Sequence, residues 1–290
     1  MFKKGFYCAL GTPIDENGNL LVESFKNQIE YMIEAGASGL LCMGSMGAEA
    51  GLTNKTYKFT AETASKTVNG RVPLLIGAMD NSVFKVKERI EMLNGLNYDG
   101  IVLTAPFYQM DTQKNLIKFF KDCADVSEKP VYLYDLPVIT KQKITFDMVK
   151  EIAKHPNIKG VKSIDTVLCR QIKLELNNFE AFHSNLDAFD VGVSFGIDKV
   201  LDGMFACMPK TSKKVALAIE NGDIKALTEN LSKMIKLRNI LAESGIWPGF
   251  TIAMNLLNLE GDYGYGYMEK NNGEEYAKKI ESYLKEIGEI

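Results

Sequence analysis

The sequence predicts an α/β protein, a (β/α)8 TIM barrel with a C-terminal helical extension. Two observations lead to this prediction. Short apolar runs that end in Gly, Pro or a polar residue alternate with longer amphipathic stretches, which is the pattern of repeated strand and helix units. About eight such units follow at a spacing of roughly 25 to 35 residues, and a barrel of this kind usually needs about 250 residues. The 290-residue chain is long enough to hold it.

The candidate strands are nearly continuous apolar runs, which indicates a sheet buried on both faces. In order they cover residues 7–10, 39–44, 73–77, 100–106, 130–135, 158–163, 179–184 and 203–208. Helical stretches fit between them, for example over 22–34 and 81–96. A doubly wound open sheet is the alternative. It normally carries a glycine-rich phosphate-binding turn after its first strand, and Gly11-Thr12-Pro13 is not such a turn.

Three further helices are expected after the eighth unit, over 213–242, 247–257 and 274–287. Gly245 and Pro248 interrupt the helical pattern there. We therefore expect residues 1–222 to form the barrel that carries the active site. Residues 223–290 are expected to form a helical extension packed on the barrel.

Composition excludes several classes of function. With 34 Lys and Arg against 37 Asp and Glu, the formal charge is −3, and the absence of a basic cluster argues against nucleic acid as a partner. No signal peptide or membrane span is recognisable. Five scattered cysteines without a CxxC pair indicate reduced thiols in a cytoplasmic protein. Only two histidines, His155 and His183, are present, and neither follows a strand, so we assign both to structure and expect no metal site.

The active site of such a barrel lies at the C-terminal ends of its strands, and Lys162 is the distinctive residue there. A lysine within an apolar strand is expected to bury its amine, and burial disfavours the charged form. A pKa lowered from about 10.4 to about 7 or 8 would make this amine a nucleophile able to form a Schiff base. The alternative is a side chain that extends to solvent.

Two neighbouring features suit the same chemistry. Tyr134 ends the preceding strand and shares a face with Tyr132, so an inward orientation would bring its hydroxyl to the Lys162 amine for proton transfer. The alternative is a tyrosine that only fills the core. The sequence Gly-Ser-Met-Gly over 44–47 forms a tight turn whose amides and hydroxyl can hold a small carboxylate, or a glycine-rich turn without a ligand.

The turn at 44–47, the Tyr-Asp-Leu-Pro segment at 134–137 and the Gly-Val-Lys strand at 160–162 resemble three signatures of the dihydrodipicolinate synthase / N-acetylneuraminate lyase family. The resemblance covers about residues 5 to 210. It implies a class I aldolase whose lysine forms a Schiff base with pyruvate or another 2-oxo acid, without a metal or organic cofactor. It also implies a homo-oligomer, a dimer or a tetramer built from dimers.

By position in these signatures, Lys162 would be the Schiff-base residue and Tyr134 the proton-transfer group. Ser45 and Met46 would present amides to the pyruvate carboxylate, and the Ser45 hydroxyl would join the proton relay. Tyr108 matches a family tyrosine that reaches across a dimer contact into the partner's site.

Two further residues are expected to contact substrate. Asp187 aligns with an acidic residue that touches substrate hydroxyls in the sialic acid lyases, although it could equally be a helix N-cap. Met204, in the eighth candidate strand, is expected to line the substrate site.

This chain departs from the family at four positions. Met46 replaces a hydroxyl residue, Ala48 stands where Glu is usual, and Asp135 replaces a common Asn. Ile139 occupies the position where the synthase branch carries an arginine for the carboxylate of its aldehyde substrate, and an apolar side chain cannot form that ion pair.

We therefore expect an N-acetylneuraminate lyase or a 2-keto-3-deoxy sugar acid aldolase, with Ile139 lining the substrate site. The alternatives are a 4-hydroxy-tetrahydrodipicolinate synthase, which condenses pyruvate with aspartate semialdehyde, and a non-catalytic barrel that binds a 2-oxo acid, suggested by Met46 and Ala48.

Overall fold

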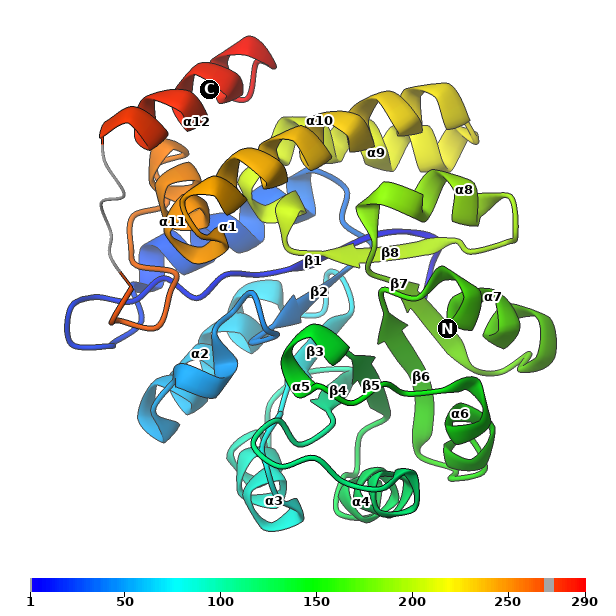
Figure 1. Cartoon of the computed structure of the whole chain (residues 1–290). Coiled ribbons are helices and arrows are strands. Elements are labelled where there is room, and N and C mark those ends of the chain that lie inside the picture. The colour runs from blue at the N-terminus through cyan, green and yellow to red at the C-terminus, as the bar shows by residue number, and fades with distance from the viewer. Residues whose placement is uncertain (1, 269–273) are drawn as a thin grey trace.

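A computed structural model describes residues 2–268 and 274–290 and confirms the barrel (Figure 1). Eight parallel strands pair in chain order, and the last pairs with the first. They are β1 (Gly5–Ala9), β2 (Gly39–Cys42), β3 (Leu74–Gly77), β4 (Gly100–Thr104), β5 (Val131–Asp135), β6 (Ile158–Ser163), β7 (Glu180–His183) and β8 (Lys199–Asp202).

Helices surround the strands. They are α1 (Val22–Glu34), α2 (Asn54–Val68), α3 (Val83–Met92), α4 (Gln113–Asp125), α5 (Pro137–Thr140), α6 (Phe146–Ile152), α7 (Thr166–Glu175), α8 (Phe189–Val193) and α9 (Pro209–Asn221), with short 3-10 helices η1 (Glu49–Gly51), η2 (Leu186–Ala188) and η3 (Met204–Cys207). Several start at a capping side chain that accepts a backbone amide hydrogen bond, such as Thr53, Ser82 and Thr112.

Alternation along each strand divides the core into two parts. Tyr132 and Tyr134 of β5 belong to a cluster inside the barrel, whereas Val131 and Leu133 belong to the larger cluster between strands and helices. The inward orientation expected for Tyr134 is therefore confirmed.

The position predicted for the eighth strand is wrong. The strand is β8, and the apolar run over 203–208 contains η3 instead. The true strand was missed because it begins with a charged residue. Lys199 is buried there between Glu180 at 3.1 Å and Asp198 at 3.0 Å, and these ion pairs offset the cost of burying its charge.

The helix predicted over 213–242 is also wrong in extent, because the structure has two helices there, α9 and α10 (Ile224–Glu243). Gly222 ends α9 with φ +67°, a conformation that favours glycine, and the Asp223 carboxylate then caps α10.

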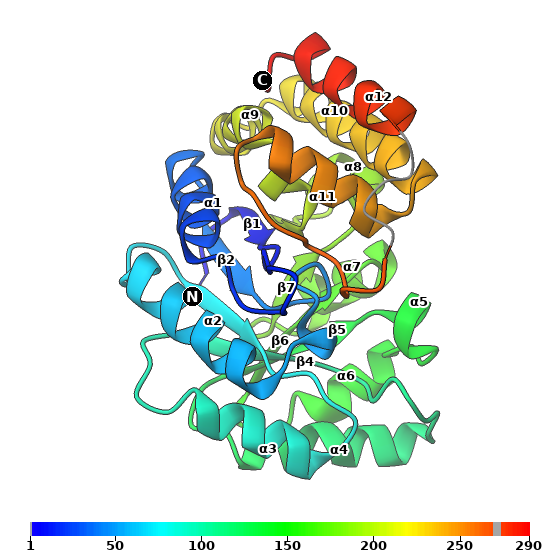
Figure 2. The same ribbon diagram turned by 90° about the vertical axis from the view of Figure 1, so that its left-hand side faces the viewer.

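The C-terminal helices α10, α11 (Ile246–Leu256) and α12 (Glu274–Glu286) lie on the opposite side of the barrel from α3 and α4 (Figures 1 and 2). The buried carboxylate of Glu289 accepts the amides of Lys210 and Thr211 at the start of α9, which attaches the chain end to the barrel. The division at residue 222 stays a prediction. Within the described residues, no helix combines the length and apolar character required to cross a membrane.

Candidate active site

Lys162 and Tyr134 are direct neighbours across β5 and β6. Their Cα atoms are register partners, and both side chains are 4% exposed inside the C-terminal end of the barrel. The Lys162 amine lies over the Tyr134 ring, 3.8 Å from its centroid. The alternative in which Lys162 extends to solvent is therefore wrong, and the apolar strand does bury an amine.

The Tyr134 hydroxyl lies 3.3 Å from the Ser45 hydroxyl, which comes from the turn after β2. The sequence predicts this hydroxyl beside the Lys162 amine, whereas in the structure the amine lies over the face of the ring. Ser45, Tyr134 and Lys162 nevertheless form one continuous group, so a proton can pass between two hydroxyls beside a buried amine.

The turn at 44–47 is held tightly from below. Thr12 donates its hydroxyl proton to the Gly47 carbonyl, 2.7 Å away, and a side chain at Gly47 would meet the Met43 Cα at 2.9 Å. Among the residues that the structure describes, none accepts a hydrogen bond from the amides of Ser45 and Met46. Two amides beside a buried amine are suited to a carboxylate.

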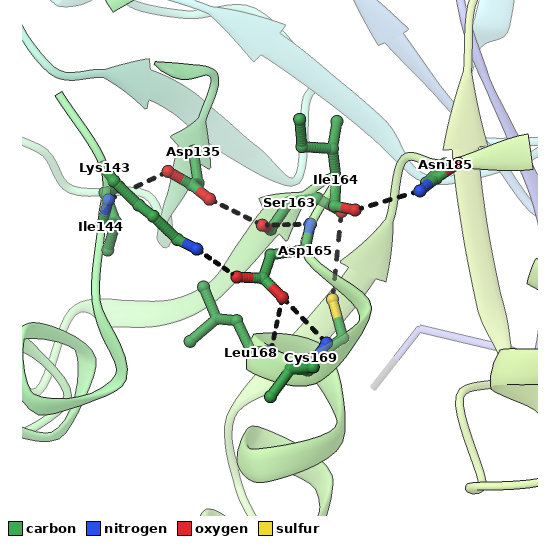
Figure 3. Close-up of polar contacts among 10 residues, drawn as sticks. Asp135, Lys143, Ile144, Ser163, Ile164, Asp165, Leu168, Cys169 and Asn185 are labelled. Atoms are coloured by element: carbon green, nitrogen blue, oxygen red, sulfur yellow. Dashed lines mark hydrogen bonds and ion pairs between the residues drawn. The ribbon is translucent and has the colours of Figure 1, made fainter. Parts of the chain in front are cut away.

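A buried network fixes the outer side of the same two strands (Figure 3). Asp135 and Ser163 follow Tyr134 and Lys162 and point the other way. The Ser163 hydroxyl donates to Asp135 at 2.8 Å, and the Ile144 amide donates to the same carboxylate at 2.9 Å. Burial raises the pKa of Asp135. These contacts hold Tyr134 and Lys162 in register from the outer side of the strands.

At the rim, Asp187 is ion-paired with Arg238 of α10, and this partner was not expected from sequence. The N-cap interpretation of Asp187 is wrong, because the Asn185 side chain caps η2. Met204 is buried at the start of η3, and its amide donates to the Asp202 carboxylate at 2.9 Å. Asp202 ends β8 and was missed because that strand was predicted too late in the chain.

A second buried titratable side chain lies beneath the turn and was also missed. Glu49 is fully buried, with Arg89 of α3 3.7 Å away, and Arg89 in turn lies 3.8 Å from Asp80. Burial raises the pKa of Glu49 to about 8, and Arg89 opposes that rise.

The remaining site candidates, Ile139 and Tyr108, lie on exposed segments that follow β5 and β4. Ile139 on α5 is 42% exposed, and Tyr108, after β4, is 82% exposed. The role of Tyr108 across a dimer contact stays a prediction. His183 is buried against Thr166, and burial lowers its pKa to about 4. All five cysteines are free and buried.

The profile of the Dihydrodipicolinate synthetase family matches residues 2–283. The chain belongs to this family. Membership confirms the resemblance drawn from the three signatures and assigns the chain to class I aldolases, which are carbon–carbon lyases.

Relatives in this family and solved structures resemble the chain over most of its length. A 4-hydroxy-tetrahydrodipicolinate synthase of Exiguobacterium sibiricum is 29% identical over 223 residues, 76% of each chain. The fold matches YagE, a prophage protein of the dihydrodipicolinic acid synthase family from E. coli K12 solved with pyruvate, at TM-score 0.91, 22% identity and full coverage of both chains. It also matches CdNal from Clostridium difficile, solved with mannosamine, at TM-score 0.88, 19% identity and 99% coverage of both chains.

Proposed function

We propose that this family member forms a Schiff base between Lys162 and pyruvate, or another 2-oxo acid, and makes or breaks a carbon–carbon bond next to it. The observation that carries the proposal is the buried Lys162 amine over Tyr134, whose hydroxyl meets Ser45. An amine enclosed in this way is protected from solvent and positioned to attack a ketone.

In the cleavage direction, the Lys162 amine adds to the ketone of a 4-hydroxy-2-oxo acid, and loss of water gives the iminium. The C3–C4 bond then breaks and its electron pair forms an enamine. The proton of the C4 hydroxyl passes to the Tyr134 oxygen, Tyr134 hands its own proton to Ser45, and the Ser45 hydroxyl gives up its proton for the enamine carbon. Protonation of the enamine and addition of water release pyruvate and the free amine. The amides of Ser45 and Met46 hold the carboxylate throughout.

For the second substrate we propose a hydroxylated aldehyde, as in N-acetylneuraminate lyases and sugar acid aldolases. Ile139 supports this choice, because it supplies no positive charge where the synthase branch needs an arginine. The second candidate is 4-hydroxy-tetrahydrodipicolinate synthase. The comparisons by themselves favour it, since the curated relatives carry that name. The non-catalytic barrel is set aside because the family consists of enzymes.

Borohydride reduction in the presence of pyruvate tests the Schiff base. The peptide with Lys162 should gain the mass of pyruvic acid less one oxygen atom. Lys199 is the internal control, because it is equally buried in the barrel but ion-paired with Glu180 and Asp198. Labelling of Lys199 instead of Lys162, or no labelling, would refute the proposal.

Assays with N-acetylneuraminate, 2-keto-3-deoxygluconate, and pyruvate plus aspartate semialdehyde separate the two candidates. Cleavage of a sugar acid supports the first. Efficient condensation of the semialdehyde would show that Ile139 does not exclude a carboxylate-bearing aldehyde, and would establish the synthase.

We also propose a cytoplasmic homo-oligomer in which Tyr108 lies at a contact between copies. Five free cysteines support a reducing compartment, and the exposed Tyr108 ring supports the contact. Analytical ultracentrifugation of the Tyr108→Ala variant should show a smaller species than the unaltered protein. Equal masses would contradict the contact.

A further inference from the structure

Arg238 and Asp187 form a pair that joins the C-terminal extension to the rim of the barrel. Two guanidinium nitrogens of Arg238 contact the two carboxylate oxygens of Asp187, at 2.5 and 3.1 Å. The guanidinium also donates twice to the Asn239 side chain. Four of its five N–H groups are thus engaged, and within the described part of the chain one on Nη1 has no acceptor.

The pair lies on the side of the barrel where the Schiff base would form. Asp187 follows β7 and Asp202 ends β8, both at the C-terminal end of the strands. Burial raises the pKa of Asp202, whereas the charges of Lys162 and Arg238 both act to lower it. The Asp202 carboxylate is therefore close enough to both Lys162 and Arg238 for their charges to act on it.

Charges at this rim balance. Arg238 lowers the pKa of Asp187 and Asp187 raises that of Arg238, so both are ionised near neutral pH. Asp202, which accepts the Met204 amide at 2.9 Å, makes no ion pair with either cation among the described residues, although the charges of both act on it. Asp187 already neutralises the charge of Arg238. A carboxylate on the second substrate would therefore gain little attraction from Arg238 and would be repelled by Asp187.

We propose that Arg238, held by Asp187, determines specificity for the second substrate, selecting a hydroxyl-rich aldehyde over one that carries a carboxylate. This rests on the proposed Schiff-base function and adds a residue of α10 to it. The group that the pair would recognise is a substrate hydroxyl, which can donate one hydrogen bond and accept another. The remaining N–H of Arg238 can donate to it while a spare lone pair of Asp187 accepts from it.

The exposure of the pair permits this contact. The Arg238 side chain is 33% exposed and that of Asp187 is 51% exposed, so both reach solvent at the rim. Lys141 offers a competing explanation, since it lies two residues from Ile139 and is exposed, with its amine donating to the Val138 carbonyl at 2.8 Å. If Lys141 recognised substrate carboxylates, Arg238 would not set the preference.

The experiment measures kcat and KM with pyruvate and two sets of aldehydes. One set carries hydroxyls, such as N-acetylmannosamine and erythrose, and the other carries a carboxylate, such as aspartate and succinate semialdehydes. The variants are R238M, R238K and D187N, with K141M to test the competing explanation. The matched control is K236M on the same helix, which removes an exposed ion pair with Glu286. Borohydride trapping of pyruvate on Lys162 reports whether each variant retains a folded site.

R238M should raise KM for hydroxylated aldehydes about tenfold or more, as expected for a lost hydrogen bond to a charged group, and R238K should restore part of that loss. D187N frees the guanidinium and should lower KM for carboxylate-bearing aldehydes several-fold. K236M and K141M should change neither.

Changes below twofold for R238M and D187N, with trapping intact, would refute the role of Arg238 alone. A rise in semialdehyde KM confined to K141M would refute it as well. Absence of trapping in the unaltered protein would instead refute the Schiff base, and the inference with it.

Discussion

Glu49→Gln should remove a pH dependence of stability that originates beneath the active-site turn. Glu49 is fully buried, and within the described residues neither carboxylate oxygen has a hydrogen bond. Burial raises its pKa from the ordinary 4.5 to about 8, although Arg89 lies 3.7 Å away. Desolvation thus outweighs the attraction of one arginine, whose charge is shared with Asp80.

The sign follows from proton uptake. Between pH 4.5 and 8 the folded protein keeps the Glu49 proton while the unfolded chain loses it, so the free energy of unfolding falls as pH rises. Each full unit of pH costs about 1.4 kcal/mol. Allowing for partial titration at both ends, the loss between pH 5 and 8 is between about 3 and 4 kcal/mol. Glutamine at position 49 does not titrate, so the variant lacks this pH dependence.

Urea unfolding of both proteins at pH 5, 6, 7 and 8 measures this. The difference, variant minus unaltered protein, should rise by that amount across the range, because other titrating groups cancel and the altered contact with Arg89 adds only a constant. E16Q, at an exposed glutamate, should give a flat difference. A difference for E49Q that varies by less than about 1 kcal/mol would mean that Arg89 keeps Glu49 ionised, and the argument from desolvation would fail.

Three further changes test the site. Tyr134→Phe keeps the ring under the Lys162 amine but removes the proton-transfer hydroxyl, so kcat should fall about 10²-fold to 10⁴-fold while borohydride trapping persists more slowly; an unchanged kcat would contradict the relay. Asp135→Ala should lower the free energy of unfolding by about 1 to 3 kcal/mol in urea, because Ser163 loses its buried acceptor, whereas Asp135→Asn should retain most of it. Equal losses would mean that the hydrogen bond is unimportant. Gly47→Ala places a methyl group 3.0 Å from a backbone oxygen, so the KM for pyruvate should rise several-fold in steady-state assays, and an unchanged KM would show that the turn does not bind the carboxylate.

The barrel could be predicted from sequence because its strands are apolar and its helices periodic. The prediction failed at β8, where Lys199 opens the strand and the next apolar run belongs to η3. Hydrophobicity locates buried segments but cannot separate a strand from a buried 3-10 helix. Only the ion pairs of Lys199 explain why a charged residue begins a barrel strand.

The proximity of the candidate site residues could be predicted because strand ends converge by topology. Lys162, Tyr134 and Ser45 each follow or end an apolar run, and the barrel brings such positions together. Arg238 has no comparable signal. It lies 51 residues after Asp187 in a helix with many charges, and their contact depends on how α10 packs against η2. Contacts of this kind require tertiary structure.

The turn at 44–47 is followed by a glutamate, but one position later than the family pattern predicts. Ala48 stands where the family usually carries glutamate, which suggested a weakened site. The structure places Glu49 one residue later, with its carboxylate buried beneath the turn and facing Arg89. Ala48 adopts φ +51°, a left-handed conformation that costs a non-glycine residue about 1 to 2 kcal/mol. The cost falls on the residue that leads the chain from the turn into η1 and places the Glu49 side chain in the interior.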